Sequence, residues 1–196
     1  MMQDNLVYKG QINSLLSPFL EKIRLGKISK HIVGNRILDF GCGYGKLASY
    51  IQDKQYVGVD LDQRAIELAR KLNKDRTGIY FYSMDDLENE TDKFDTVVMA
   101  AVIEHLDNPY EILQNMKSHL REGGRIIITT PTPMANKILR FGSKLRLFSR
   151  DAVNEHKSLL TKKDFISISF DIDIRLEIYE RFEFGLNQLV IYVYEA

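Results

Sequence analysis

The stretch RILDFGCGYGK, residues 36–46, decides the fold of this chain. An apolar run broken only by Asp39 leads directly into three glycines at alternate positions, Gly41, Gly43 and Gly45. This pattern is typical of a buried parallel strand that ends in a tight turn before a helix. Alternate glycines let a ligand approach the backbone closely, and the N–H groups at the start of the helix point toward that ligand. We therefore expect a ligand site at this turn.

The composition is that of an ordinary globular protein. The chain has 196 residues, 44% of them hydrophobic, and a formal net charge of zero. We expect one domain over residues 1–196, and the balanced charge argues against a nucleic-acid partner. The single cysteine, Cys42, excludes an internal disulfide and a zinc cluster of cysteines. No stretch approaches the roughly 18 apolar residues that span a bilayer, and the N-terminus lacks the apolar core of a signal peptide, so a cytoplasmic protein is expected.

Strands and helices alternate after the opening stretch. Helical spacing follows at 47–51, and short apolar runs then predict four more strands, at 56–60, 79–82, 94–101 and 125–130. Asp62 can cap one intervening helix, and Asn108 followed by Pro109 can begin another, which Gly123 and Gly124 would end. This alternation predicts an α/β fold, a parallel sheet with helices on both faces.

The two ends of the chain depart from this alternation. Ser17 and Pro18 can start a helix, so residues 1–35 are expected to form a helical cap; its apolar face would carry Phe19, Leu20 and Ile23. Near the C-terminus, a short helix at 162–169 precedes two strands, at 172–179 and 188–194. The link between these strands is short, which indicates an antiparallel pair.

Residues 134–160 break the pattern and are interpreted as an insertion or lid beside the acceptor site. Within them, residues 137–150 mix lysine and arginine with apolar side chains. Such a segment can contact an anionic membrane peripherally or hold a phosphate or carboxylate of an acceptor. It can equally be a solvated surface.

Polar residues follow each predicted strand at one edge of the sheet. Open parallel sheets bind ligands beyond the carboxyl ends of their strands. Asp60, at the end of the second strand, can accept both hydroxyls of a ribose, so a nucleoside-containing ligand is expected. A dinucleotide fold needs G-x-G-x-x-G, and here Lys46 occupies the third glycine position.

The segment DFGCGYG resembles the first motif of the class I S-adenosylmethionine-dependent methyltransferases, in the branch that acts on small molecules or glycans. Further segments resemble the same family over nearly the whole chain; they are FYSMDDL, FDTVVMAAVIEHLDNP, LREGGRIIITTPTP and FGLNQLVIYVYEA. The resemblance implies a Rossmann-like fold with a seven-stranded, mostly parallel sheet and an antiparallel last strand. It also implies S-adenosylmethionine as cofactor and S-adenosylhomocysteine as product.

The resemblance also assigns cofactor contacts. Asp39 matches the acid that holds the methionine ammonium, and Asp60 matches the ribose-binding acid. In one alignment Ser83 replaces the acid that binds the adenine amine, and in another alignment that acid is Asp85. The remaining positions assigned to the cofactor are Gly41, Cys42, Gly43, Leu61, Met84 and Ala100.

Such a protein catalyses methyl transfer mainly by positioning the reacting groups. Holding nucleophile, methyl group and sulfur in line can supply roughly 7 to 11 kcal/mol of the barrier. An oxygen nucleophile also needs a base, and His105 is the first candidate because imidazole titrates near neutral pH; His156 is the second. Alternatively, Glu104 and His105 only fix their loop by hydrogen bonds. Related quinone O-methyltransferases show E-x-x-E-H here and hold a divalent ion, but Ala101 replaces the first acid, so no metal is expected.

We therefore expect an S-adenosylmethionine-dependent methyltransferase that acts on an oxygen of a small-molecule or sugar acceptor. No N-P-P-Y motif, typical of amino methylation, is present. Two other functions stay open: a non-catalytic partner protein that keeps the fold, and a nucleotide-binding oxidoreductase. The motifs name the methyl donor and leave the acceptor and the oligomeric state open.

Overall fold

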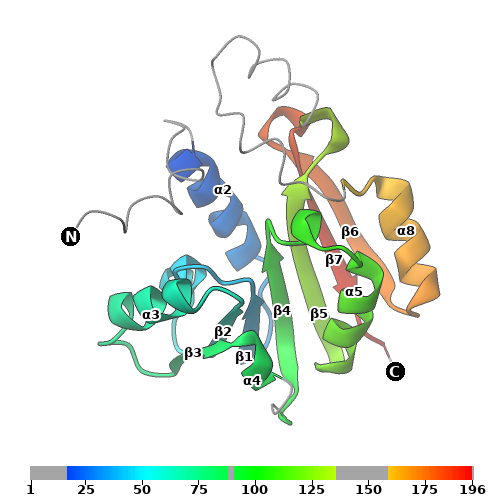
Figure 1. The fold of residues 1–196 in the computed structure, drawn as a ribbon. Coiled ribbons are helices and arrows are strands. Elements are labelled where there is room, and N and C mark those ends of the chain that lie inside the picture. The colour runs from blue at the N-terminus through cyan, green and yellow to red at the C-terminus, as the bar shows by residue number, and fades with distance from the viewer. Residues whose placement is uncertain (1–16, 88–90, 136–158, 196) are drawn as a thin grey trace.

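A computed structural model of the chain describes residues 17–87, 91–135 and 159–195 (Figure 1). The strands are β1 Arg36–Phe40, β2 Gln55–Asp60, β3 Ile79–Ser83, β4 Phe94–Ala100, β5 Leu120–Pro131, β6 Arg175–Phe182 and β7 Asn187–Val193. The α-helices are α2 Ser17–Ser29, α3 Gln63–Leu72, α4 Met84–Leu87, α5 Pro109–Ser118 and α8 Lys162–Asp171, and the 3-10 helices are η1 Lys46–Tyr50, η2 Ile103–His105 and η3 Glu183–Gly185.

The seven strands form one sheet in the order β3-β2-β1-β4-β5-β7-β6. The pairs from β3 to β5 are parallel, whereas β7 runs antiparallel to both β5 and β6. The predicted mostly parallel sheet with an antiparallel last strand is therefore confirmed. The strand order reverses between β1 and β4, so the carboxyl ends of these two strands lie where such sheets bind ligands.

Helices cover both faces of the sheet, and each face has its own hydrophobic core (Figure 1). One core joins the sheet to α5 and α8 through Leu113, Met116 and Phe165. The other joins it to α2, η1 and α3 through Ile28, Leu47 and Ile66. Each core includes alternate residues of the buried central strands, as a sheet covered on both sides requires.

Most helix starts agree with the sequence. The side chain of Asp62 accepts a hydrogen bond from the Arg64 N–H at the start of α3, and Asn108 caps α5 in the same way. Thr161 and Asp164 form a capping box at the start of α8. The sequence prediction did not include this last cap.

Four predicted details are wrong. The helix expected after the glycine turn is the short η1, because only a few residues separate the turn from β2. Helix α5 ends at Ser118, and the glycines expected to stop it lie inside β5, which begins at Leu120. Strand β6 begins at Arg175, three residues later than expected, since Ile172 and Ile174 are buried in the connection from α8.

The apolar face predicted for α2 is the fourth error. Phe19 is 62% exposed and Ile23 is 37% exposed, whereas Leu25 and Ile28 are buried. The helix is therefore anchored by the second half of its length. The predictions for residues 1–16 and for the insertion at 136–158 lie outside the described residues.

Candidate functional site

The glycine turn after β1 is fixed to the end of β2 by hydrogen bonds. The N–H groups of Gly41 and Cys42 donate to the Val59 carbonyl, at 2.8 and 3.0 Å. The Gly43 N–H donates to Asp60 Oδ2 at 2.8 Å, and the Asp62 N–H donates to Asp60 Oδ1 at 2.9 Å. Each carboxylate oxygen of Asp60 keeps acceptor capacity beyond this one bond. Asp60 thus shapes the turn and can still accept hydroxyl groups.

The glycines of this turn do different work. A Cβ on Gly41 would lie 2.5 Å from Cγ2 of Val102, and a Cβ on Gly45 would lie 2.4 Å from the Phe81 ring, so packing excludes side chains at both positions. Gly43 also has a positive φ, but a Cβ there would have no neighbour within 4 Å. The open space beside the turn therefore lies at Gly43, where a ligand can pass along the backbone.

Asp39 is buried below this turn, with 3% of its surface exposed. The Tyr56 hydroxyl donates to Asp39 Oδ2 at 2.6 Å. The pKa of Asp39 is raised from 3.8 to about 7: burial raises it most, the Tyr56 hydrogen bond lowers it, and the nearby Asp60 raises it by a smaller amount. A cation that reached this carboxyl would favour its ionised form.

Cys42 is a buried packing residue. Its Sγ lies 3.7 Å from the Gly43 carbonyl oxygen, and burial raises the pKa of the thiol. The side chain would also lie 2.9 Å from a Cβ on Gly58. Only the backbone of Cys42 is therefore suited to contact a ligand.

The end of β3 separates the two alternatives for the adenine-binding acid. The Ser83 hydroxyl and N–H both bond to Asp86 Oδ2, at 2.7 and 3.0 Å. Asp85 is exposed. Met84 packs against the core. At the end of β2, by contrast, Leu61 is 79% exposed.

The end of β4 carries a strained backbone. Ala100 is the last residue of β4. Ala101 follows with a φ of 57°, a left-handed backbone conformation that residues with a Cβ rarely adopt. Glu104 is 1% exposed and accepts a hydrogen bond from the Thr130 hydroxyl at 2.9 Å. This bond ties η2 to β5 and so holds the segment that bears the half-buried His105.

Two predicted features cannot be placed, because His156 and residues 137–150 lie outside the described residues. No helix in the described ranges is long and apolar enough to cross a membrane. Within those same ranges, no group of three or more His, Cys, Asp and Glu side chains could hold a metal ion.

Sequence reasoning missed a polar group at the β6–β7 turn. Glu183 and Asn187 bond to each other there, and Arg24 of α2 lies near enough to lower the pKa of Glu183, which burial raises. The sequence carries only a weak signal for this group, the Glu-Phe-Gly turn before the last strand.

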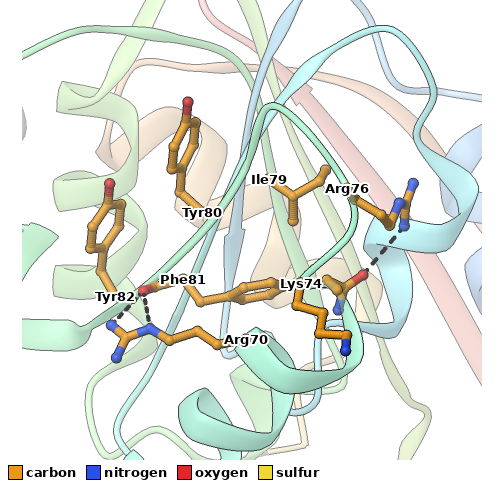
Figure 2. Close-up of a pocket in the computed structure, with 8 residues that line it drawn as sticks. Arg70, Lys74, Arg76, Ile79, Tyr80, Phe81 and Tyr82 are labelled. Carbon is orange, nitrogen blue, oxygen red and sulfur yellow. Dashed lines mark hydrogen bonds between the residues drawn. The ribbon is translucent and has the colours of Figure 1, made fainter.

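A cavity of about 290 Å³ lies along β3 and the end of α3 (Figure 2). Its two arginines are engaged: Arg70 donates twice to the Phe81 carbonyl, at 3.0 and 2.7 Å, and Arg76 donates to the Ile51 carbonyl. Figure 2 shows Tyr80 and Tyr82 pointing away from Arg70. No residue of the glycine turn lines this cavity, so it is separate from the candidate site.

Comparison with known proteins agrees with this geometry. A family model described as a methyltransferase domain matches residues 8–168. The chain belongs to this family. The chain is 29% identical over 120 residues to the ubiquinone biosynthesis O-methyltransferase of Idiomarina loihiensis, covering 57% of this chain and 49% of that protein. It is 27% identical over 126 residues to the uncharacterized protein MJ1123 of Methanocaldococcus jannaschii, covering 64% of this chain and 53% of that protein. The chain thus spans about half the length of the curated relatives it matches.

Solved structures share the fold of this chain. The plantazolicin methyltransferase BpumL, in complex with SAH, has a TM-score of 0.73 and 15% identity, over 92% of this chain and 86% of that chain. The magnesium protoporphyrin IX methyltransferase of Synechocystis PCC 6803, with bound SAH, has a TM-score of 0.67 and 17% identity, over 91% and 83%. The fold is the Rossmann-like class I fold, and S-adenosylmethionine is the cofactor of this family.

Proposed function

We propose that this protein transfers the methyl group of S-adenosylmethionine to a hydroxyl oxygen of a small-molecule or glycan acceptor. The observation that carries the proposal is Asp60, whose carboxylate accepts the Gly43 N–H beside the open space of the glycine turn. An ionised carboxylate at that position can bind both ribose hydroxyls. The relatives named ubiquinone biosynthesis O-methyltransferases support oxygen as the methylated atom.

The cofactor contacts follow the strand ends. Asp39 would face the methionine ammonium, and the backbone from Gly41 to Gly43 would follow the methionine. Asp60 and Leu61 would contact the ribose. For the adenine amine we choose Asp85 over Ser83, because the Ser83 hydroxyl is already bonded to Asp86. Met84 and Ala100 would complete the cofactor site.

His105 would remove the proton of the acceptor hydroxyl. The buried Glu104–Thr130 bond holds its segment against the end of β5, so the imidazole can stay in place as the acceptor approaches. With methyl group, sulfur and oxygen in line, the oxygen–methyl bond forms as the methyl–sulfur bond breaks, and S-adenosylhomocysteine leaves. The only role of the base is to remove the proton from the acceptor hydroxyl.

Cofactor binding and methyl transfer test the proposal separately. S-adenosylhomocysteine affinity is measured by titration calorimetry, and methyl transfer by a screen of hydroxyl-bearing acceptors with labelled S-adenosylmethionine. Asp60→Asn keeps the side-chain size, but its amide group cannot accept both backbone N–H groups. We expect about tenfold weaker binding or more, equivalent to about 1.4 kcal/mol. The control, Asp75→Asn, changes an exposed carboxylate after α3 and should leave affinity unchanged.

Two results would overturn the proposal. Unchanged affinity in folded Asp60→Asn would remove Asp60 from the site. Tight S-adenosylhomocysteine binding without transfer to any hydroxyl acceptor would favour a non-catalytic partner protein that keeps the fold.

A further inference from the structure

Among the residues that the structure describes, three buried side-chain polar atoms, two at the β6–β7 turn and one on the neighbouring helix α2, have no hydrogen-bond partner. They are Nε of Arg24, Oε1 of Glu183 and Oδ1 of Asn187. Asn187 is only 8% exposed, and its Nδ2 donates to Glu183 Oε2, so its oxygen must point away from the carboxylate. Buried polar atoms in folded proteins are nearly always bonded, and each one left without a partner costs about 1–3 kcal/mol. Three in one place indicate a site that is completed by another molecule.

The turn lies at the same edge of the sheet as the cofactor site. Asn187 pairs with Pro131, at the carboxyl end of β5, so the β6–β7 turn lies beyond the ends of the parallel strands (Figure 1). Helix α2 connects the two places. Glu21 of α2 pairs with Lys46 beside the glycine turn, while Arg24, three residues later on α2, lies near enough to Glu183 to lower its pKa. Positions three apart on a helix differ by about 4.5 Å along its axis, so Arg24 lies within one helical turn of the residue that pairs beside the glycine turn.

The backbone of the turn is strained. Glu183 has a φ of 52° and Phe184 a φ of 57°, and left-handed conformations cost roughly 1–2 kcal/mol for residues other than glycine. The Thr132 hydroxyl donates to the Gly185 carbonyl at 2.8 Å and holds the turn in place. Phe184 is fully exposed as a result. Strain retained beside unpartnered polar atoms is typical of a functional site.

The unpartnered atoms specify the chemistry of the missing group. The Glu183 and Asn187 oxygens need hydrogen-bond donors, and Arg24 Nε needs an acceptor. A hydroxyl group is both donor and acceptor, so two neighbouring hydroxyls can satisfy all three atoms. A protonated amine offers donors only and leaves Arg24 Nε without an acceptor. A carboxylate or phosphate would be repelled by the Glu183 carboxylate. Glu183 and Arg24 are each partly exposed, so a change of rotamer gives a ligand access to them.

We propose that Arg24, Glu183 and Asn187 select the methyl acceptor by binding adjacent hydroxyl groups on a neutral ring, with Phe184 packing on the ring. This inference rests on the proposed function and deepens it: it makes the β6–β7 turn the specificity determinant, apart from the cofactor residues. The shared chemistry is a vicinal diol, which either a sugar or a dihydroxy-aromatic ring supplies.

The test uses the full chain saturated with S-adenosylhomocysteine and follows the Asn187 side-chain amide by NMR. The probes are methyl glucoside and catechol, added at about 10 mM, a concentration that detects millimolar affinity. The matched controls are 1,2-dimethoxybenzene, which lacks the hydroxyls, and cyclohexylamine. We expect one of the two diols to shift the Asn187 amide, and the diol that does so identifies the source.

Variants complete the test. Glu183→Gln should weaken the diol response about tenfold and leave S-adenosylhomocysteine affinity within about twofold of the original. Glu180→Gln is the control, because this carboxylate on β6 also pairs with α2, through Lys27 at 2.7 Å, but is not among the three residues. No shift with either diol, or an equal shift with dimethoxybenzene or cyclohexylamine, would overturn the proposal. Since S-adenosylhomocysteine binding is measured in the same samples, a failure of the diol site is distinguishable from a failure of the proposed function.

Discussion

Asp39→Asn should make both the stability and the cofactor affinity of this protein less dependent on pH. The pKa of Asp39 is raised from 3.8 to about 7, first by burial and then by Asp60, despite the Tyr56 hydrogen bond. Between pH 3.8 and about pH 7, Asp39 keeps its proton in the folded protein and loses it in the unfolded chain. The stabilisation is therefore complete below pH 4 and is lost as the pH rises through 7. The full difference corresponds to about 4 kcal/mol of unfolding free energy.

The measurable part of this effect lies between pH 5.5 and pH 8. Over that range the unfolding free energy should fall by about 2 kcal/mol through Asp39 alone. Asparagine can still accept the Tyr56 hydrogen bond and carries no proton to lose, so the variant lacks this decrease. Urea unfolding of both proteins across the range gives the difference directly. Asp75→Asn serves again as the control for the removal of one carboxylate.

Cofactor affinity should change with pH in the opposite direction. If Asp39 faces the methionine ammonium, only its ionised form attracts the cofactor. Below about pH 7, affinity should then rise by up to about tenfold for each unit by which the pH is increased. Calorimetry with S-adenosylhomocysteine should show this rise in the original protein and a smaller one in Asp39→Asn. Identical pH profiles for the two proteins, in both unfolding and binding, would refute the reasoning.

Three further predictions concern the strand ends. Gly41→Ala should lower the unfolding free energy in urea by more than about 2 kcal/mol, because its Cβ would lie 2.5 Å from Val102. Gly43→Ala should cost only about 1 kcal/mol and mainly weaken cofactor binding, because a Cβ there has no neighbour within 4 Å. Equal losses of stability in the two variants would contradict this difference. Ala101→Gly should raise the unfolding free energy by up to about 1 kcal/mol, since it relieves a φ of 57°, and a decrease would mean that the left-handed backbone is not strained. His105→Ala should reduce turnover about a hundredfold or more while S-adenosylhomocysteine affinity stays constant, and unchanged turnover at saturating acceptor would leave His105 a structural role.

The sheet could be predicted from sequence because its signals are local. Each buried strand is a short apolar run, and Asp62 and Asn108 cap their helices through atoms two or three residues away. The candidate cofactor site could be assembled for the same reason. Topology brings the strand ends to one edge, so placing Asp60 at the end of a strand also places it beside the glycine turn.

The details that could not be predicted depend on distant contacts. The buried face of α2 is decided by the sheet beneath Leu25 and Ile28, and nothing in the helix itself distinguishes these from the exposed Phe19. Likewise, Arg24 and Glu183 are separated by most of the chain, and the β6–β7 turn brings them together only after β7 has paired with β5. Their side chains carry no motif that would reveal that they are neighbours.

The double hydrogen bond from Arg70 to the Phe81 carbonyl has a consequence for the protein in concentrated solution. Strand β3 ends the sheet, and unpaired backbone groups on an edge strand invite pairing with another molecule. Arg70 occupies one of these groups and Asp86 occupies the Ser83 N–H. The β3 edge of the sheet is thereby partly shielded from pairing with a foreign strand. Arg70 and Asp86, the second of them next to the proposed adenine contact, thus oppose aggregation through this edge.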